Sequence, residues 1–140
     1  MNLFAYGSLM CADILYKITA CRLSYSPATL AAYKRCSVRD ETYPGLVEEK
    51  GSSVTGVVYF SVPEDAWLRL DIFEGEMYSR GVVRVSCDDQ ISVDAATYVI
   101  RPQFRNRLSS SDWNFQEFLQ SGRKRFEEEY LGFEKLGNIR

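Results

Sequence analysis

The run from Val54 to Val62 constrains the fold most, because it is the strongest strand signal in the chain. Threonine, tyrosine and phenylalanine lie among its valines, and β-branched and aromatic residues pack well on a pleated surface. We therefore expect a sheet with this run as a central strand.

Apolar periodicity and turn residues predict further elements around this strand. Pro63, followed by Glu64 and Asp65, is typical of a first helical turn, where negative charge is favourable. The predicted strands lie at 3–6, 82–85 and 95–100, and the predicted helices at 10–18, 63–75 and 112–132.

These strands and helices alternate at uneven intervals, with hairpin-like spacing between residues 80 and 100, which favours an α+β fold. Gly7 follows a predicted strand, but no further glycines complete a dinucleotide-binding fingerprint and no Walker lysine follows. No repeat or linker-like tract is found, so we predict a single domain over residues 1–140.

The chain contains no histidine, which excludes Ser-His-Asp and Cys-His catalysis and any metal site built with histidine. Proton transfer near neutral pH must then use a carboxylate with a raised pKa, a lysine or cysteine with a lowered pKa, or a tyrosine. The net charge of -2, with both signs interspersed, lacks the cationic footprint of nucleic-acid binding. We expect no nucleic-acid partner.

The four cysteines, Cys11, Cys21, Cys36 and Cys87, lack the spacing of a zinc-binding pair. The first residues show no signal-peptide pattern, and no apolar run reaches the roughly eighteen residues of a membrane helix. We expect reduced, buried thiols in a cytoplasmic protein without a metal site or membrane association. Cys36, which follows two basic residues, is the best of weak candidates for a nucleophilic thiol.

Tyr6-Gly7-Ser8-Leu9 lies between a predicted strand and a predicted helix. Free backbone N–H groups in such a turn can bind an anionic or carbonyl oxygen. Alternatively, the glycine only permits a tight turn. Taken alone, the segment favours this second interpretation.

Glu74 lies between Phe73 and Gly75 at a predicted helix end, where a carboxylate is unfavourable for the helix dipole. A carboxylate desolvated by aromatic neighbours would have its pKa raised from roughly 4.3, as a general acid and base near neutral pH requires. Spacing alone favours an exposed glutamate beside a capping glycine. Asp71 and Glu76 are interpreted as surface charges.

Tyr43-Pro44-Gly45 is typical of a turn, with the tyrosine ring available as a pocket wall or simply part of a loop. Arg80 and Arg84 can bind a substrate carboxylate or form ion pairs, for instance with Glu76. We favour the ion pairs.

Together these segments resemble the gamma-glutamylcyclotransferase-like family, also called the AIG2-like family. The resemblance spans residue 3 to about residue 133, and its most specific elements are the YGSL turn and FEG-x-x-Y-x-R. The matching segments, in order, are YGSL at 6–9, YPG at 43–45, GVVY at 56–59, LDIFEG at 70–75 with Tyr78 and Arg80, and residues 126–133.

This resemblance implies a small α+β fold with a mixed β-barrel-like sheet, flanking helices and a site at its mouth. It also implies intramolecular aminolysis of a γ-glutamyl compound to 5-oxo-L-proline and a free amine, without metal or cofactor. By position, Glu74 is the catalytic acid and base. The substrate-binding residues are Tyr6, Gly7, Ser8 and Leu9, with Tyr43, Tyr78 and Tyr98 as pocket neighbours.

Two alternatives stay open. A non-catalytic module could hold a small carboxylated ligand in the same pocket, although Glu74 weighs against it. Removal of a γ-glutamyl protecting group from a biosynthetic intermediate would share the chemistry and differ only in the leaving amine. The expected partner is a small γ-glutamyl molecule, and the expected state is a monomer or weak homodimer.

Overall fold

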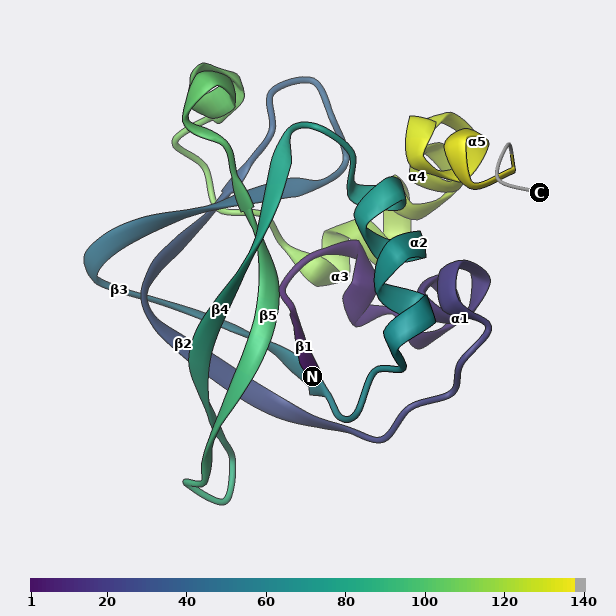
Figure 1. The fold of residues 1–140 in the computed structure, drawn as a ribbon. Helices are drawn as coiled ribbons and strands as arrows, with labels where there is room; N and C mark the ends of the chain where they lie inside the picture. The colour runs from purple at the N-terminus through teal and green to yellow at the C-terminus, as the bar shows by residue number, and fades with distance from the viewer. Residues whose placement is uncertain (138–140) are drawn as a thin grey trace.

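The structure, a computed structural model, describes residues 1–137. Its sheet closes into a barrel (Figure 1), which confirms the expected α+β class with a barrel-like sheet. In spatial order around the barrel the strands are β1 (Asn2–Ala5), β3 (Pro44–Tyr59), β2 (Tyr25–Ser37), β4 (Tyr78–Cys87) and β5 (Ser92–Ile100).

Strand β1 closes the barrel. It pairs antiparallel with β3, where Phe4 lies opposite Val58, and parallel with β5, where Leu3 lies opposite Ala96. The other neighbouring strands are antiparallel. The turn that follows β1 therefore begins at the end of a strand that lies between β3 and β5.

The run that dominates the sequence forms the second half of β3 and pairs with both β1 and β2. Its central position is confirmed, although the strand ends at Tyr59 rather than at Val62. The hairpin expected between residues 80 and 100 is the antiparallel pair β4 and β5.

A long antiparallel ribbon of β2 and the first half of β3 was not predicted. Its register shifts between Ala31 and Tyr33, beside Ala32 with a φ of 65°. Pro44 and Gly45 begin β3 instead of forming the expected turn, so that interpretation is wrong. A proline is tolerated there because the first residue of a strand need not donate to the ladder.

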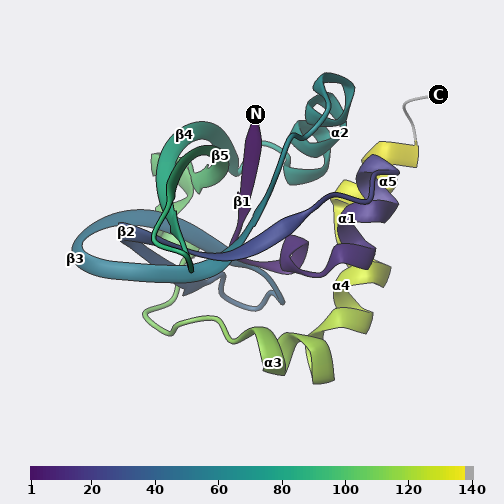
Figure 2. The same cartoon turned by 90° about the horizontal axis from the view of Figure 1, so that it is seen from below.

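Four of the helices, α1, α2, α4 and α5, lie together on one side of the barrel (Figure 2). Helix α2 begins after Pro63 with two acidic residues in its first turn, as the sequence predicted. The helical elements are η1 (Ser8–Met10), α1 (Ala12–Thr19), α2 (Glu64–Glu74), η2 (Pro102–Arg107), α3 (Phe115–Glu117), η3 (Phe118–Gly122), α4 (Arg123–Glu129) and α5 (Leu131–Gly137).

The apolar stripe predicted as one helix from Asp112 to Gly132 forms several shorter pieces. A π-helical turn, η3, separates α3 from α4. At Tyr130 the backbone is extended, with ψ 122°, and this residue interrupts the helix between α4 and α5. The stripe does face the core, because Phe118 and Phe126 are buried. The interruption places α5 against α2.

The core consists of two apolar clusters, one formed almost entirely by strands and one between the barrel and the helices. Alternation along β1 serves both, because Phe4 joins the first cluster while Leu3 and Ala5 join the second. Strand β1 therefore links the barrel to the helical layer.

All four cysteines are free, but only Cys36 and Cys87 are buried, whereas Cys11 and Cys21 are half-buried. The expectation of buried thiols holds for the first pair and is wrong for the second. Over residues 1–137, none of the helices combines the length and apolar character needed to cross a membrane.

Candidate active site

A cavity of about 30 Å³ lies where the turn after β1 meets the end of α2. The structure brings all eight predicted site residues to its wall, from segments far apart in the sequence. These residues are Tyr6, Gly7, Ser8, Leu9, Tyr43, Glu74, Tyr78 and Tyr98.

The turn after β1 is fixed by hydrogen bonds to two of its backbone carbonyls. The Met10 N–H donates to the Gly7 carbonyl at 3.0 Å, and the buried Tyr59 hydroxyl donates to the Leu9 carbonyl at 2.7 Å. A Cβ atom at position 7 would lie 2.9 Å from the ring of Pro44. This close approach of Pro44 leaves no room for a side chain on Gly7.

Glu74 is the last residue of α2 and lines the cavity half-buried. Burial, with a smaller contribution from the charge of Asp71, raises the pKa of Glu74 to about 8. Within residues 1–137 no basic side chain forms a salt bridge with it. A carboxyl in this state exchanges a proton readily near neutral pH.

Tyr6 and Tyr98, which line the cavity with Glu74, each donate one hydrogen bond. The Tyr6 hydroxyl donates to the Tyr98 carbonyl at 2.6 Å, and the Tyr98 hydroxyl donates to Asp71 Oδ1 at 2.7 Å. Burial is the main reason that the pKa of each tyrosine is raised above its ordinary value. Both hydroxyls therefore remain protonated donors near neutral pH.

Tyr78 and Tyr130 fix two other parts of the wall. The Tyr78 hydroxyl donates to the Pro44 carbonyl at 2.7 Å, and the Tyr130 hydroxyl donates to the backbone carbonyl of Glu74 at 3.0 Å. Burial raises the pKa of both tyrosines, so they too remain protonated. Tyr130 thereby connects the C-terminal helices to the carboxyl-bearing end of α2.

Asp71 does more than the surface charge expected from the sequence. Besides accepting from Tyr98, it lies 3.3 Å from Arg80 Nε. Arg84 pairs with Asp94 at 2.9 Å. The arginines do form ion pairs, as favoured, but the suggested partner Glu76 is wrong for both.

A second cavity, of about 280 Å³, shares Tyr43, Phe73, Glu74 and Tyr130 with the first. The rings of Tyr43 and Tyr130 meet edge to face with centroids 5.0 Å apart. Because a water molecule needs roughly 10–15 Å³, the first cavity has room for only a few atoms. Both rings belong to the wall that the two cavities share.

Sequence reasoning missed the contribution of the C-terminal helices to the cavity. Phe126 and Tyr130 line it, whereas their helical spacing predicted only a stripe that docks on the core. Their place depends on the interruption at Tyr130, which the spacing gave no reason to expect.

Cys36 does not line the cavity, and burial raises the pKa of its thiol, the reverse of what a nucleophile needs. In the part of the chain that the structure describes, no three or more His, Cys, Asp or Glu side chains gather closely enough to hold a metal ion.

Two comparisons, with a family model and with a related sequence, point to the same family. Residues 3–115 match the family model described as gamma-glutamyl cyclotransferase, AIG2-like. The AIG2-like protein D of Arabidopsis thaliana is 31% identical over 121 residues, covering 85% of this chain and 79% of that protein.

Solved structures show the same fold. A solution structure from Arabidopsis thaliana aligns with a TM-score of 0.71 at 28% identity, covering 91% of this chain and 77% of that one. A structure described as a gamma-glutamyl cyclotransferase aligns with a TM-score of 0.65 at 19% identity, covering 99% and 87% of the two chains. The second likeness shows the fold alone.

Proposed function

The chain belongs to the gamma-glutamyl cyclotransferase, AIG2-like family, and from that premise we propose that it converts a γ-glutamyl compound into 5-oxo-L-proline and a free amine. Family membership suggests an enzyme of the cyclotransferase type. The observation that carries the proposal is the carboxyl of Glu74, with its pKa raised to about 8, on the wall shared with the Tyr6–Leu9 turn.

In this reaction the substrate supplies its own nucleophile. The α-amino nitrogen of the γ-glutamyl group attacks the γ-carbonyl carbon, and the new C–N bond closes a five-membered ring. The bond from that carbon to the leaving nitrogen then breaks, and one proton passes from the attacking to the leaving nitrogen. The protein needs only to hold the substrate folded and to carry this proton.

Glu74 is the proposed proton carrier. As a carboxylate it accepts the proton of the attacking amine, and as a carboxylic acid it returns that proton to the leaving nitrogen. A pKa of about 8 keeps both forms populated near neutral pH. The tyrosines that line the cavity have raised pKa values and remain protonated near neutral pH. Among these described residues, Glu74 is therefore the group that gains and loses a proton there.

The two cavities suggest how the substrate lies. We place the γ-glutamyl group against the turn that follows β1, with the leaving amine directed toward the second cavity. This placement requires the first cavity to widen by movement of Tyr43 and Tyr130, which both cavities share. This assignment is supported by Glu74, which lines both cavities and can therefore reach the attacking and the leaving nitrogen.

The test is to incubate the purified protein with γ-glutamyl amines, γ-glutamyl amino acids and glutathione, and to measure 5-oxoproline. We expect release from at least one substrate, and Glu74→Gln to lower kcat about a hundredfold or more, because an amide of the same shape cannot carry the proton. Glu64→Gln, at the exposed opposite end of α2, is the matched control and should keep the parent rate.

Calorimetry with a non-reactive γ-glutamyl analogue separates binding from catalysis, and Glu74→Gln should keep the parent affinity. Parental turnover by Glu74→Gln would contradict the role of this carboxyl. A parent that binds the analogue yet releases no 5-oxoproline from any substrate would contradict the proposed reaction and favour a binding module.

A further inference from the structure

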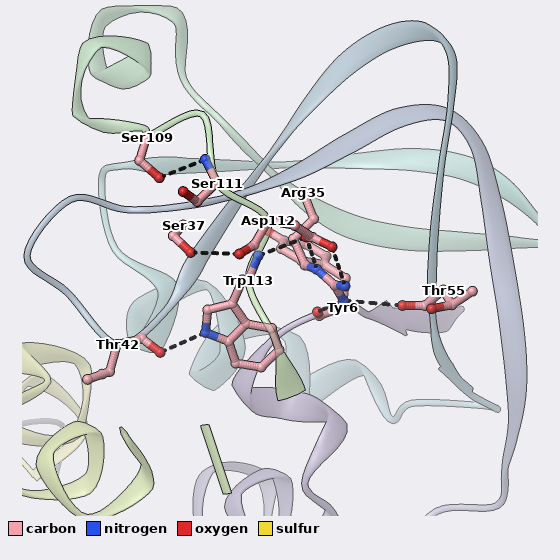
Figure 3. Close-up of polar contacts among 9 residues, drawn as sticks. All are labelled: Tyr6, Arg35, Ser37, Thr42, Thr55, Ser109, Ser111, Asp112 and Trp113. Atoms are coloured by element: carbon pink, nitrogen blue, oxygen red, sulfur yellow. Dashed lines mark hydrogen bonds and ion pairs between the residues drawn. The ribbon is translucent and has the colours of Figure 1, made fainter. Parts of the chain in front are cut away.

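The guanidinium of Arg35 joins three segments of the chain behind the turn that follows β1 (Figure 3). Its Nη1 donates to the Tyr6 carbonyl at 3.1 Å and to the Thr55 carbonyl at 3.4 Å. Its Nε and Nη2 face the two carboxylate oxygens of Asp112 at 3.0 and 3.4 Å. Only 13% of the Arg35 side chain is exposed, whereas 67% of the Asp112 side chain is, so the guanidinium is buried while its carboxylate partner lies at the surface.

Trp113 extends this network to Thr42 (Figure 3). Its backbone N–H donates to Asp112 Oδ1 and its indole N–H donates to the Thr42 carbonyl, both at 2.8 Å. The ring lies 5.5 Å from the Arg35 guanidinium. Thr42 directly precedes Tyr43, which lines the cavity as Tyr6 does, so one connected set of contacts reaches two segments of its wall.

The hydrogen bond from Arg35 to the Tyr6 carbonyl also fixes the direction of the Gly7 N–H, because both groups belong to the same peptide unit. In a trans peptide the carbonyl and the following N–H point in opposite directions. The Tyr6 carbonyl points toward Arg35, which does not line the cavity, whereas Gly7 does. The Gly7 N–H therefore points away from Arg35.

Within residues 1–137, no carbonyl or side chain accepts a hydrogen bond from the Gly7 N–H. A backbone donor beside a cavity is costly to leave unpaired. Together with the orientation of its peptide, this makes the Gly7 N–H a donor available to a ligand.

We propose that Arg35 is a positioning residue, which holds the Tyr6–Gly7 peptide so that the Gly7 N–H donates to an oxygen of the bound γ-glutamyl group. The proposal rests on the proposed function for the identity of the ligand. An arginine suits the task because its planar fork holds the Asp112 carboxylate with two nitrogens while Nη1 also holds the Tyr6 carbonyl.

The experiment compares Arg35→Met, Arg35→Lys and Asp112→Asn with the parent. Arg69→Met is the matched control, because Arg69 Nε also donates to a backbone carbonyl, that of Ile18 at 2.6 Å, away from the cavity. For each protein we would measure kcat/KM, the free energy of unfolding, and the NMR shift of the Gly7 amide when 5-oxoproline is added.

We expect Arg35→Met to lower kcat/KM about tenfold or more, the effect of losing one well-placed hydrogen bond. Arg35→Lys should recover part of this loss, because an ammonium can bind one of the partners, and Asp112→Asn should show the smallest loss. Arg69→Met should keep the parent kcat/KM even if it is destabilised as much as Arg35→Met. The response of the Gly7 amide to 5-oxoproline should weaken in the order of the kcat/KM losses.

Two failures are distinguishable. A parent that turns over substrate while Arg35→Met and Arg69→Met share the same kcat/KM would overturn the positioning role alone. A parent that neither releases 5-oxoproline from any substrate nor shifts its Gly7 amide on addition of 5-oxoproline would overturn the proposed function and, with it, the role of Gly7.

Discussion

At the scale of single residues, the raised pKa of Glu74 makes the free energy of unfolding depend on pH, whether or not the protein is active. The folded protein binds this proton with a pKa of about 8, against 4.5 for an unperturbed glutamate. Folding therefore favours the protonated form, and the corresponding stability is fully present below about pH 4.5 and is lost as the pH rises through about 8.

We predict that Glu74→Gln removes this pH dependence, because an amide does not titrate. The free energy of unfolding of the variant, relative to that of the parent, should rise steadily between about pH 5 and pH 8. Urea unfolding at several pH values measures the difference. Parallel pH curves for the two proteins would show that the pKa of Glu74 is not raised by folding.

A second prediction at this scale concerns the turn. Gly7→Ala should abolish binding of the γ-glutamyl analogue, because the added Cβ would lie 2.9 Å from the rigid ring of Pro44. Ser8→Ala should bind nearly as well as the parent, since it loses at most one hydrogen bond, worth about 1 kcal/mol. Calorimetry measures both affinities, and circular dichroism checks that each variant is folded.

A Ser8→Ala variant that loses binding while Gly7→Ala keeps it would mean that the hydroxyl, rather than the backbone, is the main anchor. The site would then depend on the side chain of Ser8, which lines the cavity.

At the scale of elements, the packing of α5 on α2 depends on one glycine. A Cβ atom on Gly132 would lie 2.2 Å from the Phe73 carbonyl and 2.4 Å from the ring of Tyr130. Gly132→Ala should therefore push α5 away and cost roughly 1–3 kcal/mol of unfolding free energy.

Gly137→Ala is the control in the same helix, because a Cβ atom there would meet nothing within 4 Å. Because Tyr130 would move with α5, Gly132→Ala should also change the affinity for the γ-glutamyl analogue. Equal stabilities for the two alanine variants would contradict the close packing of α5 on α2.

The elements that the sequence predicted correctly are those whose own residues have a strong local preference for a strand or for a helix start. The valines of β3 and the Pro63 start of α2 are examples. Strand β2 was missed because Ala31 and Ala32 are weak strand formers and the positive φ of Ala32 breaks the alternation. The interruption at Tyr130, which places α5 against α2, does not follow from the helical spacing of the apolar residues.

The candidate site was predictable residue by residue only through its resemblance to a family. Spacing alone favoured an exposed Glu74 and a tight turn without a binding role. The two lie together only because the barrel closes, which spacing does not predict. The roles assigned to these residues stay predictions until they are tested, and Arg35 was not singled out because its partners lie far away in the sequence.

At the scale of the whole molecule, the proposed chemistry needs only groups that the chain and its substrate carry. We predict that 5-oxoproline release survives a metal chelator and alkylation of accessible thiols, since Glu74 and the backbone of the turn are the proposed reacting and binding groups. Cys36 and Cys87 are buried from such reagents, and Cys11 and Cys21 do not line the cavity. Loss of activity in a chelator, restored by a divalent ion, would contradict this mechanism.

The closure of the barrel by its first strand also sets an order of events in time. The hydroxyl of Tyr6 bonds to a carbonyl 92 residues later in the chain, and the carbonyl of Phe4 accepts from a threonine 93 residues later. During synthesis β1 leaves the ribosome before β5, so the two strands can meet only after the residues between them have followed. Contacts of such long range are slow to form, so we expect the cavity to be completed late in folding and activity to return together with the native barrel in a refolding experiment.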